Sequence, residues 1–195
     1  MKNYFNEYKL AKLTLAKMAA QFYDCDLSLD EAKKYGIEYN KYSYRKKSVN
    51  CCFHRFEPSG EYIWSALGID SPIITYDELW DIADAIKEEE ILNEDYHEEY
   101  LKMSICALGM VIKFYGHKVP FKDAKAIKYD KNFDLYEGKV DTYYHMFEST
   151  GETVWKLLGF EEPIVASSVV YAKQKELTKE LLELTQEKKK TLSIK

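Results

Sequence analysis

The residues best suited to acid–base chemistry lie in a motif that the chain contains twice. Residues 54–73 read HRFEPSGEYIWSALGIDSPI and residues 145–164 read HMFESTGETVWKLLGFEEPI, with ten of twenty positions identical. In the first copy His54 precedes Glu57 and Glu61, and a His beside a carboxylate is a common acid–base pair. Each motif position also has a structural explanation as a helix cap, a partner of the helix dipole, a buried Trp or a helix-ending Gly. Because a scaffold survives in both copies of a repeat more readily than an active site, we interpret the motif as structural and expect no catalytic residues.

Metal and cofactor binding have less support. A zinc site uses three or four ligands with paired spacings, and no two histidines lie four residues apart. Only an interface between the two copies, where His54 and Glu57 would meet His145 and Glu148, keeps an enzyme or a metal site as an alternative. The chain contains no Gly-rich phosphate-binding loop and no nucleophile elbow. We therefore predict no metal and no cofactor.

The cysteines indicate a reducing compartment. None of the four forms a Cys-x-x-Cys pair, and scattered thiols are typical of cytosolic proteins. Cys51 and Cys52 are neighbours, which disfavours a disulfide between them, and their aromatic surroundings predict burial. No stretch of about 18 apolar residues is present, and residues 1–7 lack the apolar core of a signal peptide. These features predict a cytoplasmic protein without a membrane span.

The charge of the chain is concentrated in two segments. The 195 residues carry a net charge of −5, which argues against a basic DNA-coating protein. Residues 77–99 contain eleven acidic residues and one Lys, a net charge of −10, whereas residues 33–47 carry +5. Neither segment is matched in strength by its counterpart in the other copy of the repeat. We therefore interpret these charges as the specialised part of a duplicated scaffold.

Each charged segment provides a candidate binding surface. The acidic one would occupy a basic groove on a partner protein, with steering by its electrostatic field. The basic one interleaves Tyr with Lys and Arg, a combination that single-stranded nucleic acid or nucleotides require. The acidic candidates are Asp77, Asp81, Asp84, Glu88, Glu89, Glu90, Glu94 and Asp95. The basic and aromatic candidates are Lys41, Tyr42, Tyr44, Arg45, Lys46 and Lys47.

The elements that would position these residues form an α+β protein built by tandem internal duplication. We expect one repeat unit over residues 1–92 and a second over 93–195, packed as one compact body about a pseudo-two-fold axis. Each unit is predicted to run long helix, short helix, β-hairpin, short helix and final helix. The hairpins are expected to pair 39–44 with 49–56 and 133–136 with 140–147, because aromatic runs flank their turns.

Local signals predict where the helices begin and end. Ser28, Pro120 and the sequence Thr75-Tyr76-Asp77-Glu78 would open helices, and Ser167 or Ser168 would begin the last one. Ser59 and Thr150 are predicted N-caps of the motif helices. Gly116 is expected to end the long helix of the second unit, and Gly68 and Gly159 are expected to end the motif helices.

Together these observations predict a non-enzymatic cytosolic binding protein that acts by protein–protein interaction. Tyr, with 17 residues, is enriched at protein interfaces. By analogy with small acidic Tyr-rich proteins of mobile elements, the specific hypothesis is a phage-type inhibitor, of the anti-CRISPR kind, of a host nucleic-acid-handling or defence complex. The alternative is a nucleic-acid or nucleotide binder that uses residues 33–47. The second alternative is the enzyme or metal site at the repeat interface.

Overall fold

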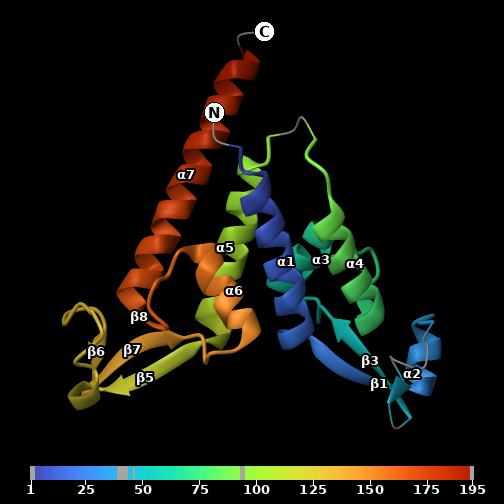
Figure 1. The fold of residues 1–195 in the computed structure, drawn as a ribbon, viewed down its shortest axis with the longest axis horizontal. Coiled ribbons are helices and arrows are strands. Elements are labelled where there is room, and N and C mark those ends of the chain that lie inside the picture. The colour runs from blue at the N-terminus through green and yellow to red at the C-terminus, as the bar shows by residue number, and fades with distance from the viewer. Residues whose placement is uncertain (1–2, 39–43, 46, 93–94, 194–195) are drawn as a thin grey trace. The chain divides into compact units, whose positions relative to one another are not determined.

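The chain folds into two units that both combine helices with antiparallel strands. The computed structural model describes residues 3–38, 44–45, 47–92 and 95–193. Residues 9–94 form the N-terminal unit, and residues 1–8 with 95–195 form the C-terminal unit. The α+β class is therefore confirmed (Figure 1). None of the helices within the described ranges is both long and apolar enough to cross a membrane.

The two units contain corresponding elements in the same order (Figure 1). The first series is α1 (Phe5–Phe22), β1 (Asp24–Ser28), α2 (Leu29–Lys34), β2 (Tyr44–Arg45), β3 (Ser48–Phe53), α3 (Pro58–Leu67), β4 (Ile73–Thr75) and α4 (Tyr76–Glu88). The second series is α5 (His97–Phe114), β5 (Gly116–Pro120), the 3-10 turn η1 (Phe121–Asp123), β6 (Leu135–Tyr136), β7 (Lys139–Tyr144), α6 (Ser149–Leu158), β8 (Ile164–Ala166) and α7 (Ser167–Ser193). Among the elements of the described residues, the two series differ in type at one position, where the 3-10 turn η1 stands in place of α2.

Each unit has one central strand that pairs on both sides. In the N-terminal unit Cys51 of β3 pairs with Cys25 of β1 on one side and with Thr75 of β4 on the other. In the C-terminal unit Thr142 of β7 pairs in the same way with His117 of β5 and Ala166 of β8. The short strands β2 and β6 complete the two sheets.

The sequence predicts only the hairpins β2–β3 and β6–β7, whereas the structure also contains the strands β1, β4, β5 and β8. These strands have three or five residues, and β5, which reads GHKVP, is largely exposed. They are held by pairing to a buried central strand rather than by a strand-forming pattern of their own. The predicted hairpins were also too long at one end, because β3 stops at Phe53 and β7 at Tyr144. Residues 39–43 lie outside the described part of the chain.

Most predicted helix boundaries are confirmed. Ser28 and Thr75 both form complete capping boxes, with Glu31 and Glu78 respectively. Gly68 and Gly159 end α3 and α6 in the left-handed conformation, each with a φ of 72°. The next N–H in each case donates to a carbonyl in the last helical turn, as a Schellman motif requires.

Three predicted boundaries are wrong. Gly116 does not cap α5, because the helix ends at Phe114, its C-cap is Tyr115 with a φ of −106°, and Gly116 begins β5. Ser59 and Thr150 lie inside their helices, whose N-caps are Glu57 and Glu148. A longer side chain replaces Ser or Thr at this cap in α6, where the Glu148 carboxylate accepts from the Gly151 N–H at 2.8 Å. Pro120 ends β5 and is the N-cap of η1, so the short helix expected after it is present as a single 3-10 turn.

The start of α7 is held by a carboxylate from a distant part of its own unit. Asp134 is fully buried and accepts hydrogen bonds from the Ser168 N–H at 2.7 Å and the Ser168 hydroxyl at 2.6 Å. It also accepts from the Asp130 N–H at 2.7 Å. In α4 the capping box of Thr75 and Glu78 does this work, but 91 residues later the chain has Ala166 and Val169, which carry no side-chain oxygen. Asp134 therefore holds the first turn of α7 through hydrogen bonds to Ser168, from a segment more than thirty residues earlier.

This arrangement predicts that Asp134→Ala destabilises the C-terminal unit by about 2–4 kcal/mol, because two partly buried N–H groups and one hydroxyl lose a charged acceptor. Urea unfolding followed by circular dichroism measures the change in the free energy of unfolding. Asp123→Ala, which removes an exposed carboxylate, is the matched control and should change stability little. Equal effects of the two substitutions would show that Asp134 does not hold the helix.

Candidate functional site

The repeated motif forms the same cluster of side chains in both units. In the N-terminal unit the Tyr23 hydroxyl donates to Glu57 Oε1 at 2.5 Å. The ring of Trp64 packs edge-on against Tyr23 and His54, with centroids 5.7 and 5.6 Å apart. Tyr23 and Trp64 are both buried. We call this set, with Gly60, the motif cluster.

The C-terminal unit repeats these contacts closely. The Tyr115 hydroxyl donates to Glu148 Oε1 at 2.7 Å, and burial with this hydrogen bond raises the pKa of Tyr115. Trp155 packs edge-on against Tyr115 and His145 at 5.5 and 5.4 Å. The motif cluster is therefore a feature of both units.

The histidines of the motif cluster are bonded to backbone and not to the glutamates. His54 Nδ1 accepts from the Phe56 N–H at 3.0 Å, and His145 Nδ1 accepts from the Phe147 N–H at 3.0 Å. The glutamate three residues after each His instead accepts a hydrogen bond from a Tyr hydroxyl. The acid–base pair that the spacing suggested is absent from the described contacts of both units.

The Gly of the motif is required by a close approach of two backbone segments. A Cβ at Gly60 would lie 2.4 Å from the His54 carbonyl oxygen, and a Cβ at Gly151 would lie 2.4 Å from that of His145. Both distances are far below van der Waals contact with backbone atoms that cannot move aside. Any side chain at these positions would push the short helix away from the turn that precedes it.

That turn is strained in both units. Arg55 and Phe56 have φ values of 55° and 52°, and Met146 and Phe147 have 57° and 51°. Two successive positive φ angles define a type I′ turn, which favours Gly or Asn. A residue with a Cβ costs about 1–2 kcal/mol in this conformation.

The second residue of each strained turn exposes its ring. The exposed fraction is 68% for Phe56 and 67% for Phe147. These turns were not predicted from the sequence, since neither contains the Gly or Asn that signals a type I′ conformation. The only signal is the repetition of Phe itself, which burial in a core would equally explain.

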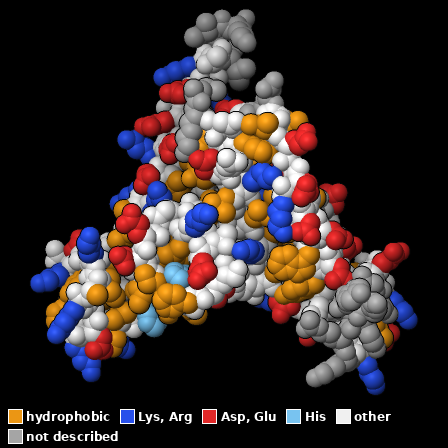
Figure 2. All heavy atoms as spheres, viewed as in Figure 1, with side chains coloured by type: hydrophobic (Ala, Val, Ile, Leu, Met, Phe, Trp, Pro, Cys, Tyr) orange, Lys and Arg blue, Asp and Glu red, His pale blue; other side chains and the backbone are white. Residues whose placement is uncertain are grey.

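The acidic candidates separate into two groups in the structure. Asp77, Asp81, Asp84 and Glu88 follow one another at helical spacing along one face of α4, and Figure 2 shows acidic side chains along this helix. Trp80 lies among them with 44% of its surface exposed. We call these five residues the acidic face.

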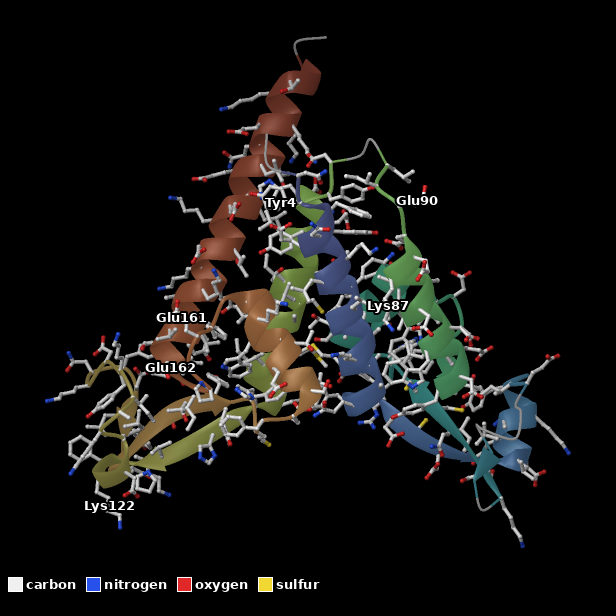
Figure 3. All side chains as sticks on the ribbon, viewed as in Figure 1. Tyr4, Lys87, Glu90, Lys122, Glu161 and Glu162 are labelled. Carbon is white, nitrogen blue, oxygen red and sulfur yellow. The ribbon has the colours of Figure 1, made fainter. Side chains whose placement is uncertain are left out.

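The remaining acidic candidates do not extend the acidic face uniformly. Glu89 forms an ion pair with Lys12 at 2.5 Å, and Asp95 forms one with Lys188 at 3.1 Å. Glu90 is exposed beyond the end of α4, as Figure 3 shows, and Glu94 lies outside the described residues. The charge is partly offset at Asp84, which lies 2.6 Å from Lys87 Nζ.

The corresponding face of α7 has a different charge. The residues 91 positions after the four carboxylates of α4 are Ser168, Ala172, Lys175 and Lys179. The position of Trp80 is taken by Tyr171. One helix face in a repeated framework therefore carries four carboxylates in one unit and two lysines in the other.

The basic candidates lie mostly outside the described part of the chain. This applies to Lys41, Tyr42 and Lys46. The backbone of Tyr44 and Arg45 forms β2, whereas Lys47 is exposed in the following turn with a φ of 75°. Binding of nucleic acid by this segment stays a prediction.

The thiols have no features of a nucleophile. Cys51 and Cys52 are fully buried, and burial raises the pKa of Cys51 to about 12. All four cysteines are free thiols. Over the described ranges, no group of three or more His, Cys, Asp or Glu side chains is arranged to hold a metal ion. Comparisons with protein-family models, curated proteins and solved structures find no match to this chain.

The strained turns predict an unusual stabilising substitution. Met146→Gly should raise the free energy of unfolding by about 1 kcal/mol, because Gly adopts a positive φ without a Cβ clash. Met146→Ala removes the same exposed side chain but keeps the strain, so it is the matched control and should be close to neutral. Urea unfolding of the two variants measures the difference, and a Gly variant no more stable than the Ala variant would contradict the strain.

Proposed function

We propose that the chain is a non-enzymatic binding protein that acts by protein–protein contact through the acidic face of α4. The observation that carries this proposal is the exposed indole of Trp80 among four carboxylates. Trp is the residue type most enriched among interface residues that dominate binding energy. An exposed Trp on a helix that already buries Leu79, Ala83 and Ile86 is not needed by the core of its own unit.

The charges around Trp80 indicate the kind of partner. Asp77 and Glu88 lie eleven positions apart, which corresponds to about 16 Å of helix. Such a row of carboxylates favours a basic groove and raises the rate of association with it. The indole requires an apolar pocket within or beside that groove. A basic groove with an apolar pocket is typical of proteins that handle nucleic acid.

The biological class that we propose follows from this partner. The chain would be a phage-type inhibitor, of the anti-CRISPR kind, that acts in the cytoplasm on a host nucleic-acid-handling or defence complex. Its framework would have arisen by tandem duplication, with boundaries near residue 92 and a pseudo-two-fold relation between the copies. The matching order of elements and the two motif clusters support the duplication. The charge difference between α4 and α7 supports specialisation after it.

The test compares a charge variant with a matched control. Asp77→Asn, Asp81→Asn, Asp84→Asn and Glu88→Gln together should lower the association rate and weaken the dependence of affinity on salt. The control removes four exposed carboxylates elsewhere, with Asp123→Asn, Glu152→Gln, Glu183→Gln and Glu187→Gln. Affinity capture from bacterial lysate treated with nuclease, followed by kinetics on the purified partner, provides the measurement.

Trp80→Ala tests the apolar part of the same surface. It should weaken binding by about tenfold or more, mainly through faster dissociation. If the acidic-face variants and the control bind alike, the proposed surface is wrong. If capture requires intact nucleic acid, the alternative through residues 33–47 is favoured instead.

A further inference from the structure

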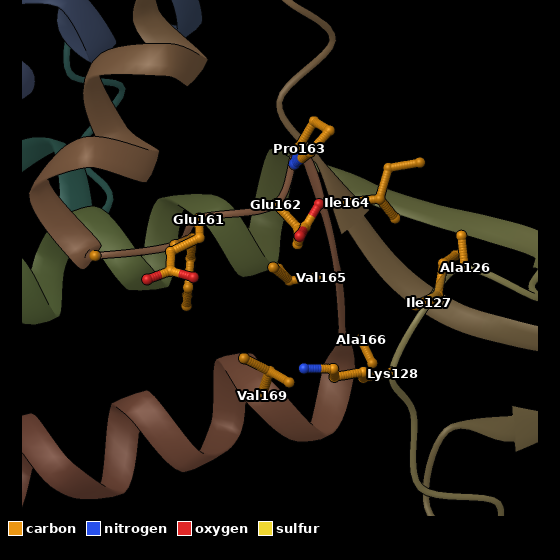
Figure 4. A pocket seen from close by; sticks show the side chains of 12 residues that line it. Ala126, Ile127, Lys128, Glu161, Glu162, Pro163, Ile164, Val165, Ala166 and Val169 are labelled. Carbon is orange, nitrogen blue, oxygen red and sulfur yellow. The ribbon is translucent and has the colours of Figure 1, made fainter.

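The C-terminal unit contains an open cavity of about 430 Å³ beside β8. Its walls come from residues 126–128, from the loop after α6 and from the start of α7 (Figure 4). Most of the lining is apolar and includes Ile127, Phe160, Pro163, Ile164, Ala166 and Val169. Ligand pockets typically begin at about 300 Å³, so this cavity suits a small ligand.

The N-terminal unit has polar residues where this cavity has an apolar wall. Ala166 and Val169 stand 91 positions after Thr75 and Glu78, which form the capping box of α4. A capping box stabilises a helix because it satisfies backbone N–H groups at the helix start, and α7 has none of its own at this point. Because Asp134 caps α7 from a distance, Ala166 and Val169 are free to form an apolar surface.

Charges of both signs lie at the mouth of the cavity. Lys128 comes from one wall, and Glu161 and Glu162 come from another. All three side chains are exposed. In Figure 4 the Lys128 side chain points toward Val169, over the apolar wall. Within the described ranges, Lys128 makes no ion pair.

We propose that this cavity binds a free apolar α-amino acid. The ligand side chain would occupy the apolar walls, its carboxylate would pair with Lys128, and its ammonium would pair with Glu161 or Glu162. A simple carboxylic acid would face two glutamates without an ammonium, and a simple amine would face the lysine without a carboxylate. A zwitterion with an apolar side chain is the ligand class that satisfies both signs of charge together with the apolar lining. The inference is independent of the acidic face of α4.

The first experiment measures binding to the full chain by isothermal titration calorimetry and by NMR chemical shifts. The ligands are L-phenylalanine and two analogues, 2-phenylethylamine, which lacks the carboxylate, and 3-phenylpropionate, which lacks the ammonium. L-Phenylalanine should bind, and each analogue should bind about tenfold more weakly, since each loses one charge-assisted contact. If L-phenylalanine does not bind at millimolar concentration, or if either analogue binds equally well, the proposal is overturned.

The second experiment introduces, at two positions of the cavity wall, the residue types that the N-terminal unit has at the corresponding positions. Ala166→Thr with Val169→Glu would restore a capping box to α7, so thermal unfolding should occur at the same temperature or higher, whereas binding of L-phenylalanine should be lost. Lys128→Met should weaken the binding of L-phenylalanine but leave the binding of 2-phenylethylamine unchanged. Lys122→Met, an exposed Lys outside the cavity that Figure 3 labels, is the matched control and should bind as the unmodified chain does. Full binding by the double variant or by Lys128→Met would refute the assigned site.

Discussion

The close approach between the motif helix and the turn before it is the constraint on which both units depend. Gly60 and Gly151 allow a backbone separation that no side chain would permit. This approach places the His ring where its Nδ1 accepts a hydrogen bond from the backbone N–H of the Phe two residues later. It also packs the Trp against the Tyr, whose hydroxyl donates to the Glu three residues after the His. The repeated motif is therefore one interlocking structure, in which loss of one member would leave a buried polar partner or a gap beside the Trp.

The same constraint explains the strained residues. A chain that must leave a central strand and begin a helix within four residues uses a tight turn, and here the turn passes through two left-handed positions without Gly. The surrounding hydrogen bonds and ring contacts hold this conformation against its cost. The Phe at the second position remains exposed in both units. The strain is found in both units, unlike the charges of α4.

Several helix ends were predictable from the sequence, whereas the edge strands were not and the surfaces were only partly so. Capping boxes and left-handed Gly caps depend on a few adjacent residues, so Thr75, Ser28 and Gly68 were identified correctly. The edge strands β1 and β5 depend on pairing with a strand some 25 residues away, which no local pattern encodes. Asp134 belongs to the same class, because its three donors come from two segments more than thirty residues apart. Similarly, the acidic run predicted a charged surface. Only the structure separates the row on α4 from Glu89 and Asp95, each of which forms an ion pair with a lysine of its own unit.

The last helix of each unit is where the two units diverge most in chemistry. Its opening residues are Thr75 and Glu78 in α4 but Ala166 and Val169 in α7, and its exposed face is acidic in α4 but carries lysines in α7. Neither change disturbs the motif cluster, because the cluster is built from the opening helix, the central strand and the motif helix. Because the motif cluster does not use the exposed face of the last helix, the residues on that face can differ between the two units. In α7 the two positions of the capping box are apolar, and the buried Asp134 carboxylate instead accepts hydrogen bonds from the Ser168 N–H and hydroxyl in the first turn. Because a distant segment of the unit provides this polar contact, the start of α7 combines a hydrogen-bonded first turn with an apolar wall beside β8.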